Sequence, residues 1–290
     1  MGIKTLATGY KGKFVRPTGY KYPLGLTPFL IPSSANAATN TTGGTQTIDG
    51  TNTVHSFTSS GFFVSGFTGN IEYLAVGGAG AGGRVDSQGG GGGAGGLVYG
   101  YNQPIVVDSN TEIVIGAGGA ASINPLNIPA TPGNNTSISF SPSPVVALKG
   151  GKGGAQGGPG TADGGGNGLF GSGGGGAAYN TPFGFGTPGQ GNDGGSGSGP
   201  ADAGGGGGGA GAAGSPGDAG RTGGVGLEYS ISGSPIFYSN GGTGSFSNNP
   251  GGPAGTANRG NGGGPTGGSG VVIVRYETTQ IINSPSYRIE

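Results

Sequence analysis

Short apolar segments rich in β-branched and aromatic residues recur along the first half of the chain. They are separated by Gly, Asn, Ser and Pro, and none sustains the 3.6-residue period of an amphipathic helix. Strands are therefore expected at residues 53–60, 61–67, 71–78, 96–100, 104–107, 111–116, 136–141, 144–150 and 270–276. Short strands at this spacing predict an all-β fold of the β-sandwich type.

The strand expected at 270–276 follows the others after a glycine-rich stretch of more than one hundred residues. Because this last strand has the same character as the earlier ones, the stretch is interpreted as an insertion that leaves the sandwich and returns to it. The predicted organisation is an extended N-terminal arm, a β-sandwich, a glycine-rich insertion and a C-terminal tail. Their bounds are 1–40 for the arm, 41–150 plus 270–277 for the sandwich, 151–269 for the insertion and 278–290 for the tail.

Glycine accounts for 79 of the 290 residues, and for 50 of the 120 residues from 151 to 270. Ordering a glycine costs about 0.5–1 kcal/mol more than ordering an alanine, and few side chains here can be buried in compensation. Polyglycine-II helices offer another source of stability. They have three residues per turn and no internal hydrogen bonds, so neighbouring chains can pair their outward-facing backbones. The sequence "GGGGGGAGAAGSPGDAGRTGGVG" at 204–226 predicts one or two passes through such a bundle.

Two other glycine-rich structures are rejected. Collagen needs a long unbroken Gly-X-Y period, whereas here glycine recurs every third residue only from Gly214 to Gly226. A phosphate-binding loop needs Ser or Thr after its lysine, and "GGKGGA" at 150–155 has neither.

The N-terminal arm is basic, with no acidic residue before Asp49. Prolines at 17, 23, 28 and 32 exclude a helix there, because proline lacks the N–H that a helix needs. We interpret residues 1–40 as an extended docking arm that lies on an acidic surface of a partner protein. Its candidate docking residues are Lys4, Lys11, Lys13, Arg16 and Lys21.

Charged residues make up 8% of the chain, with 12 basic and 12 acidic side chains, so nucleic acid is not expected as a partner. There is no cysteine and one histidine, His55, which is expected on a strand face. Isolated aspartates at 163, 193, 202 and 218 lack the paired spacing of a cation site. We therefore expect no catalytic residues, no metal and no cofactor, and hence no enzyme. No apolar run reaches the roughly 20 residues of a membrane span, so membrane insertion is not expected.

The segments "NIEYLAVGGAGAGG", "GGGGAGGLVYG", "TEIVIGAGGA" and "GGSGVVIVRY" together carry a resemblance to a known family. Over roughly residues 47–277 the chain resembles the glycine-rich domain proteins of tailed phages, found especially as tail fibres and adhesins. The resemblance implies a virion structural protein that binds the host cell surface. Such a protein is made in the host cytoplasm without a secretion signal and is released by lysis. The alternatives are a head-decoration or neck fibre that acts as a rigid spacer, and a surface adhesin of non-phage origin.

Aromatic residues occur between the glycine runs, at 177–190, 234–240 and 243–249, where the helices of a bundle are expected to reverse. Aromatic side chains at exposed turns suit contact with a host surface glycan or protein. Alternatively, they cap the bundle or pack between protomers of a homo-oligomer, of which a trimer is favoured. The candidate receptor-binding residues are Tyr179, Phe183, Phe185, Phe237, Tyr238 and Phe246.

Overall fold

The computed structural model describes residues 41–83, 88–122, 130–155, 170–179, 182–246 and 251–278. The chain divides into two units, Met1–Ala37 and Ala38–Glu290, and all described residues belong to the second. The predicted docking residues of the arm, Lys4, Lys11, Lys13, Arg16 and Lys21, lie outside the described residues, as do residues 279–290 of the predicted tail.

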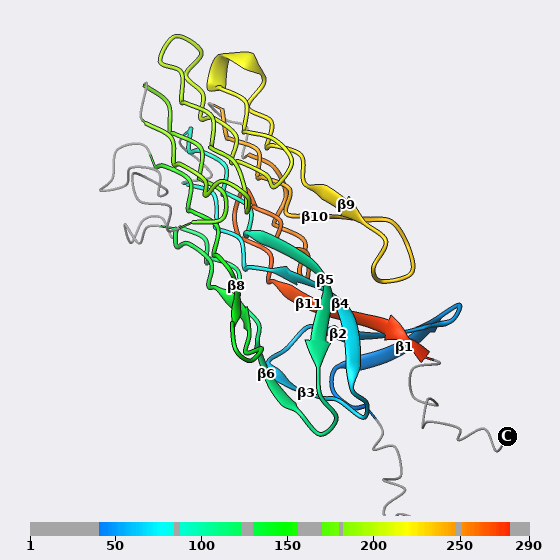
Figure 1. The fold of residues 1–290 in the computed structure, drawn as a ribbon. Coiled ribbons are helices and arrows are strands. Elements are labelled where there is room, and N and C mark those ends of the chain that lie inside the picture. The colour runs from blue at the N-terminus through cyan, green and yellow to red at the C-terminus, as the bar shows by residue number, and fades with distance from the viewer. Residues whose placement is uncertain are drawn as a thin grey trace, which may run out of the picture. The chain divides into compact units, whose positions relative to one another are not determined.

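The described part of the chain is all-β, with two antiparallel sheets that form a sandwich, as the strand pattern predicts (Figure 1). The larger sheet has the order β1-β2-β11-β4-β5. Its strands are β1 (Thr45–Asp49), β2 (Asn52–Phe57), β11 (Val271–Glu277), β4 (Gly69–Val76) and β5 (Leu97–Ile105). The smaller sheet has the order β3-β6-β7-β8, with β3 (Gly61–Val64), β6 (Asn110–Val114), β7 (Thr136–Ile138) and β8 (Val145–Ala147).

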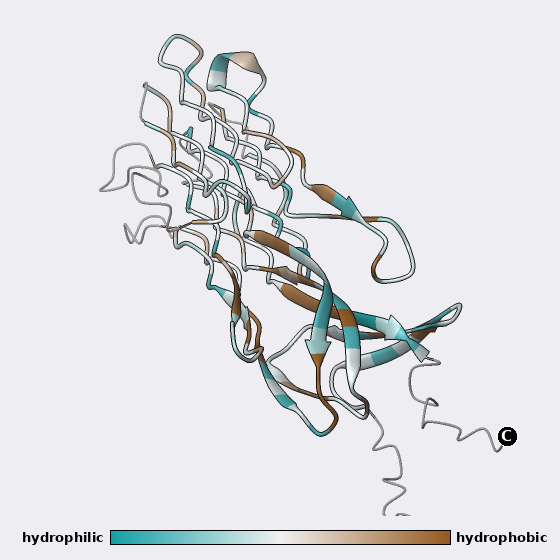
Figure 2. Ribbon diagram, in the orientation of Figure 1, coloured by the Kyte–Doolittle hydropathy of each residue, from teal (hydrophilic) through white to brown (hydrophobic). Residues whose placement is uncertain are grey.

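The core of the sandwich follows from the alternation of side chains along its strands. Ile71, Tyr73 and Ala75 of β4 face the smaller sheet, and Val272 and Val274 of β11 lie beside them. They pack with side chains of the smaller sheet and its loops, chiefly Phe63, Ile113, Ile138 and Phe140. Figure 2 shows apolar residues concentrated on these strands, whereas the glycine-rich segments beyond them are close to neutral in hydropathy.

A second apolar cluster covers the other face of the larger sheet. Leu74, Val76, Val271 and Ile273 point to this face, and the hairpin of β9 (Leu227–Tyr229) and β10 (Ile236–Tyr238) packs on it. Because both faces of the central strands are covered, β11 carries a continuous apolar run rather than an alternating one. The hairpin lies inside the stretch that the sequence assigned to the glycine-rich insertion.

The glycine-rich segments form a hydrogen-bonded lattice, which we call the glycine lattice. Consecutive amides of segment 90–96 donate to three different neighbouring segments in rotation. Every third amide returns to the same neighbour: Gly90, Gly93 and Gly96 donate to the carbonyls of Gly154, Gly151 and Leu148. The intervening amides donate to residues 205 and 208 of one segment and 263 and 260 of another. This rotation is the signature of three residues per turn, the geometry of polyglycine II.

Each inner segment of the glycine lattice is surrounded on all sides. Segment 90–96 donates to segments 148–154, 205–208 and 260–263, and accepts from segments 77–83, 172–175 and 242–245. Segment 204–209 repeats the pattern, since its amides donate in rotation to 242–245, 173–176 and 212–215. Both segments are buried although they consist almost wholly of glycine. Backbone pairing therefore takes the place of a side-chain core.

The glycine lattice extends the sandwich directly. Segment 77–83 continues β4, segment 90–96 precedes β5, and segment 260–270 precedes β11. Figure 1 shows these segments running side by side beyond the ends of the strands. The lattice therefore includes residues before 150 as well as those between 151 and 269. One short 3-10 helix, η1 (Gly217–Ala219), occurs at a turn within it.

Candidate functional site

The aromatic residues predicted to form one receptor-binding set lie in three separate places. Tyr179 and Phe246 lie at the end of the glycine lattice, which we call the distal end. Phe183 and Phe185 lie on a flank of the lattice, and Phe237 and Tyr238 lie in strand β10. The six residues therefore do not form one set in the structure.

The distal end consists of turns that backbone hydrogen bonds hold next to one another. The Ala178 amide donates to the Gln88 carbonyl, and Ala203 bridges both Ser198 and Phe246. The Gln88 side-chain amide also donates to the Asp202 carboxylate, with 2.5 Å between nitrogen and oxygen. Four segments that are far apart in sequence, at positions 88, 178, 198–203 and 246, are thereby linked.

Two aromatic side chains are presented at this end. Tyr179 is 60% exposed and stands at a positive φ of 64°, which marks a tight chain reversal. Phe246 is 41% exposed, and the Arg221 guanidinium lies 5.0 Å from its ring centroid, in cation–π geometry. The distal end thus offers an aromatic and polar surface on a backbone that the lattice holds in place.

Phe183 and Phe185 project from an outer segment of the lattice. Gly184, between them, donates to the Gly174 carbonyl and accepts from the Gly194 amide. The two rings contact each other edge to face, with centroids 5.4 Å apart. Their position on a flank makes them suitable as controls for residues at the distal end.

The prediction for Tyr238 is wrong with respect to exposure, because its side chain is only 2% exposed. In β10, Tyr238 pairs with Leu227, and Ile236 pairs with Tyr229, so these side chains face the larger sheet. Phe237 pairs with Glu228 on the opposite face of the hairpin and is 48% exposed. Strand alternation, which the sequence analysis did not apply to this short hairpin, separates the two aromatics.

The model of the glycine-rich domain family matches residues 51–277. The chain belongs to this family. The match takes in most of the sandwich and the whole glycine lattice, so the glycine-rich domain comprises both parts. No match was found among curated proteins.

His55 is part of the core of the sandwich in the glycine-rich domain. It is fully buried between the sheets, beside the rings of Phe63 and Tyr276. Its Nδ1 lies 2.6 Å from the Gly43 carbonyl and its Nε2 lies 3.1 Å from the Tyr276 hydroxyl. Nδ1 therefore carries the proton and Nε2 accepts from Tyr276. Burial lowers the pKa of His55, so the neutral ring is favoured in the folded state.

The described residues of the glycine-rich domain hold no group of three or more His, Cys, Asp or Glu side chains suited to a metal ion. Within the same residues, no helix is long and apolar enough to cross a bilayer. Of the isolated aspartates, Asp193 accepts from the Gly186 amide and Asp202 from Gln88. These two carboxylates thus hold turns of the glycine-rich domain together.

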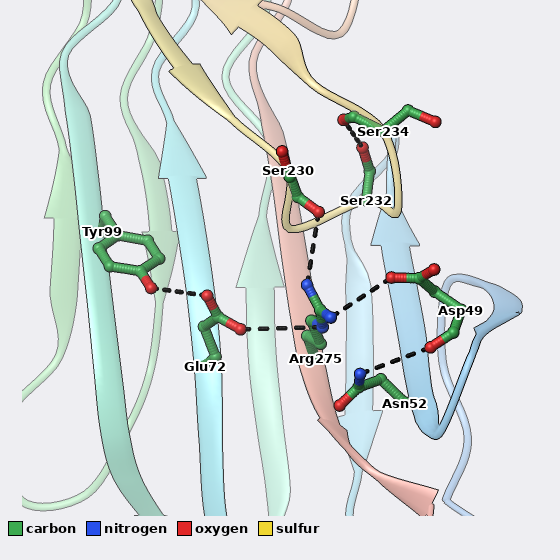
Figure 3. Close-up of polar contacts among 8 residues, drawn as sticks. All are labelled: Asp49, Asn52, Glu72, Tyr99, Ser230, Ser232, Ser234 and Arg275. Atoms are coloured by element: carbon green, nitrogen blue, oxygen red, sulfur yellow. Dashed lines mark hydrogen bonds and ion pairs between the residues drawn. The ribbon is translucent and has the colours of Figure 1, made fainter.

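The sequence analysis missed one polar network on the larger sheet (Figure 3). The Tyr99 hydroxyl of β5 donates to Glu72 of β4 over 2.6 Å, and Glu72 lies 4.0 Å from the Arg275 guanidinium. Arg275 of β11 also pairs with Asp49 at 3.3 Å and donates to the Ser230 carbonyl at 3.4 Å. The hydrogen bond to Glu72 raises the pKa of Tyr99 to about 12. The alternation in "GLVYGYN" at 96–102 could have indicated that Tyr99 and Tyr101 lie on one face of a strand.

Proposed function

We propose that the protein is a structural protein of a phage virion, of the tail-fibre or surface-fibre type, and that its distal end contacts the host cell surface. The observation that carries the proposal is the glycine lattice, whose inner segments bind six neighbours through the backbone. Such an array is stiff, and its interior has no room for side chains that recognise a partner. Specific contacts are then left to the turns, which can vary without disturbing the packing.

Tyr179 and Phe246 are the residues we assign to host contact. They are exposed at 60% and 41%, and their backbones are held by the lattice through positions 178 and 203. A rigid aromatic side chain with few rotatable bonds loses little entropy when it binds. Arg221 over the Phe246 ring adds a cation to the same surface.

Residues 1–40 are proposed to attach the protein to the virion. Their five basic side chains, without a nearby acid in sequence, suit an acidic surface on another virion protein. Deleting residues 1–40 should leave the glycine-rich domain folded and abolish its incorporation into particles. Incorporation that persists would place the attachment elsewhere in the chain.

The test of host contact uses virions that carry the double variant Tyr179→Ala with Phe246→Ala. We expect slower adsorption to the host strain and an unchanged melting temperature of the purified protein. The control is Phe183→Ala with Phe185→Ala, which removes two aromatics from the flank and should leave adsorption unchanged. Normal adsorption of the distal-end variant would favour a rigid spacer in a head-decoration or neck fibre.

A further inference from the structure

A recess lies between β5 at the edge of the larger sheet and β9 of the hairpin, and none of its lining residues belongs to the turns of the distal end. Its volume is about 240 Å³. Its walls include Val98, Tyr99, Gln190, Ala210, Leu227 and Tyr229. Pockets for drug-sized ligands are about 300–1,000 Å³, so this recess suits a smaller ligand of about one ring.

Two aromatic rings form one wall of the recess. The ring centroids of Tyr99 and Tyr229 are 4.9 Å apart, with the planes inclined by 34°. Tyr99 is 38% exposed, and Leu227, on the same face of β9 as Tyr229, is 39% exposed. An aromatic face of this kind carries partial negative charge and attracts the slightly positive C–H groups of a ligand ring.

The aromatic wall is fixed before any ligand binds. Figure 3 shows the Tyr99 hydroxyl directed at Glu72, and Arg275 placed between Glu72 and Asp49. The same guanidinium reaches Ser230, which follows β9 and so anchors the hairpin to the sheet. Binding therefore needs little reorganisation of Tyr99 and Tyr229, which lowers its entropic cost.

The turn that carries Gln190 is also held in place. The Gln190 carbonyl accepts from the Leu97 amide over 3.0 Å, which fixes the turn against β5. The Gln190 side-chain amide is used in bonds to the Leu148 amide and the Val146 carbonyl. Both polar atoms of the Gln190 side chain are therefore already hydrogen-bonded within the protein.

None of the residues that line the recess carries a charge. Glu72, Arg275 and Asp49, near Tyr99, are paired with one another, and Glu228 of β9 lies on the opposite face of the hairpin. An anionic or cationic ligand would find no opposite charge within the recess. A neutral ligand with an apolar face and many hydroxyl groups matches both the aromatic wall and the backbone groups.

We propose that this recess binds a single ring of a neutral carbohydrate, with the C–H face of the sugar on the face of Tyr99 or Tyr229 that does not pack against the other ring. The proposal does not rest on the host-contact role of the distal end, because the recess involves other residues. It adds a carbohydrate site to the sandwich side of the protein.

The test titrates the full-length protein with D-glucose, D-galactose, D-mannose and N-acetyl-D-glucosamine while backbone amide signals are followed by NMR. At least one sugar should shift the signals of residues 97–99, 189–190 and 227–229. The chain has no tryptophan, so tyrosine fluorescence should report the same binding. Choline and inorganic phosphate serve as charged probes and should leave these signals in place.

The variant Leu227→Arg replaces a half-exposed side chain of the recess with a long, charged one. It should weaken sugar binding by about tenfold or more, which corresponds to about 1.4 kcal/mol. The matched control is Phe237→Arg, which places the same side chain at a 48% exposed position on the opposite face of the same hairpin, outside the recess. It should bind sugar as the wild type does. The absence of any shift with all four sugars would overturn the proposal. So would undiminished binding by Leu227→Arg, or binding of choline or phosphate in place of sugar.

Discussion

Replacing Gly206 with alanine tests the packing of the glycine lattice at one of its inner segments. A Cβ atom at this position would lie 2.0 Å from the Thr222 carbonyl oxygen and 2.5 Å from its carbon, whereas ordinary contact begins at 3.4 Å. The obstacle is backbone, so no side chain can rotate away. Segments 204–209 and 221–224 would have to move apart by more than 1 Å.

The energetic cost follows from the bonds that this movement would break. The Gly224 amide donates to the Gly207 carbonyl at 2.9 Å directly between the two segments. A shift of segment 204–209 also strains the bond from the Gly206 amide to the Ser215 carbonyl and the bond from the Gly195 amide to the Gly206 carbonyl. A buried group left without a partner costs about 1–3 kcal/mol, and overpacking costs about 1–3 kcal/mol more. The gain from a stiffer unfolded chain is only about 0.4–1 kcal/mol. We therefore expect a loss of about 3 kcal/mol, the middle of a range of about 1–5 kcal/mol, and a larger loss for Gly206→Val.

The measurement is the free energy of unfolding by urea, followed by circular dichroism and supported by thermal melting. A loss of 3 kcal/mol corresponds to a fall of about 6–12 °C in Tm for a domain of this size. The control is Gly61→Ala in β3, where an added Cβ would have no atom within 4 Å. That variant should match or slightly exceed the wild type. If Gly206→Ala melts like Gly61→Ala, segment 204–209 is not packed as described and the reasoning fails.

Three further predictions concern the sandwich and the β9–β10 hairpin that packs on it. Burial lowers the pKa of His55 below the unfolded value of 6.5, so the neutral ring stabilises the fold above pH 6.5 and this stabilisation is lost on acidification. The free energy of urea unfolding should therefore be lower at pH 5.5 than at pH 7.5. A His55→Gln variant with the same dependence of stability on pH would contradict this. The pKa of Tyr99 is raised to about 12 from 10 in the unfolded chain, so the stability of the fold should fall as the pH rises from 10 to 12. Ultraviolet titration of the wild type and of Tyr99→Phe gives the pKa of Tyr99 by difference. A Tyr99 that titrates near pH 10 would refute the prediction. Tyr238→Ala should lose about 3–5 kcal/mol of stability, whereas Phe237→Ala, which truncates an exposed side chain, should lose less than about 1 kcal/mol; equal losses in urea unfolding would contradict the assigned burial.

Much of the sandwich was predictable because its strands are short apolar segments rich in β-branched and aromatic residues, bounded by turn residues. The strand expected at 71–78 is β4 at Gly69–Val76, and the one expected at 270–276 is β11 at Val271–Glu277. Residues 96–100 and 104–107 were expected as two strands but join as β5, since Pro104 lies on an edge strand where its missing N–H is tolerated. β1, with four of its five residues exposed, gave no apolar signal.

The arrangement of the glycine segments could not be read from the sequence. The three-residue geometry follows from composition, but the partner of each amide depends on which segments lie side by side. Gly91, for example, donates to Gly205, and Gly92 donates to Gly263. Every glycine is chemically alike, so no side chain marks these pairings in advance. The same limit applies to the aromatic residues, whose grouping at the distal end, flank and hairpin depends on the lattice.

Hydrogen exchange of the intact protein tests the glycine lattice most directly. Amides of segments 90–96 and 204–209 are donors to neighbouring backbones and are buried, so we predict slow exchange, comparable to that of β4 and β11. A flexible glycine-rich linker would exchange these amides at the rate of an unfolded chain. Strong protection throughout both segments is the result that the account predicts, and unprotected amides there, beside protected strands, would contradict it.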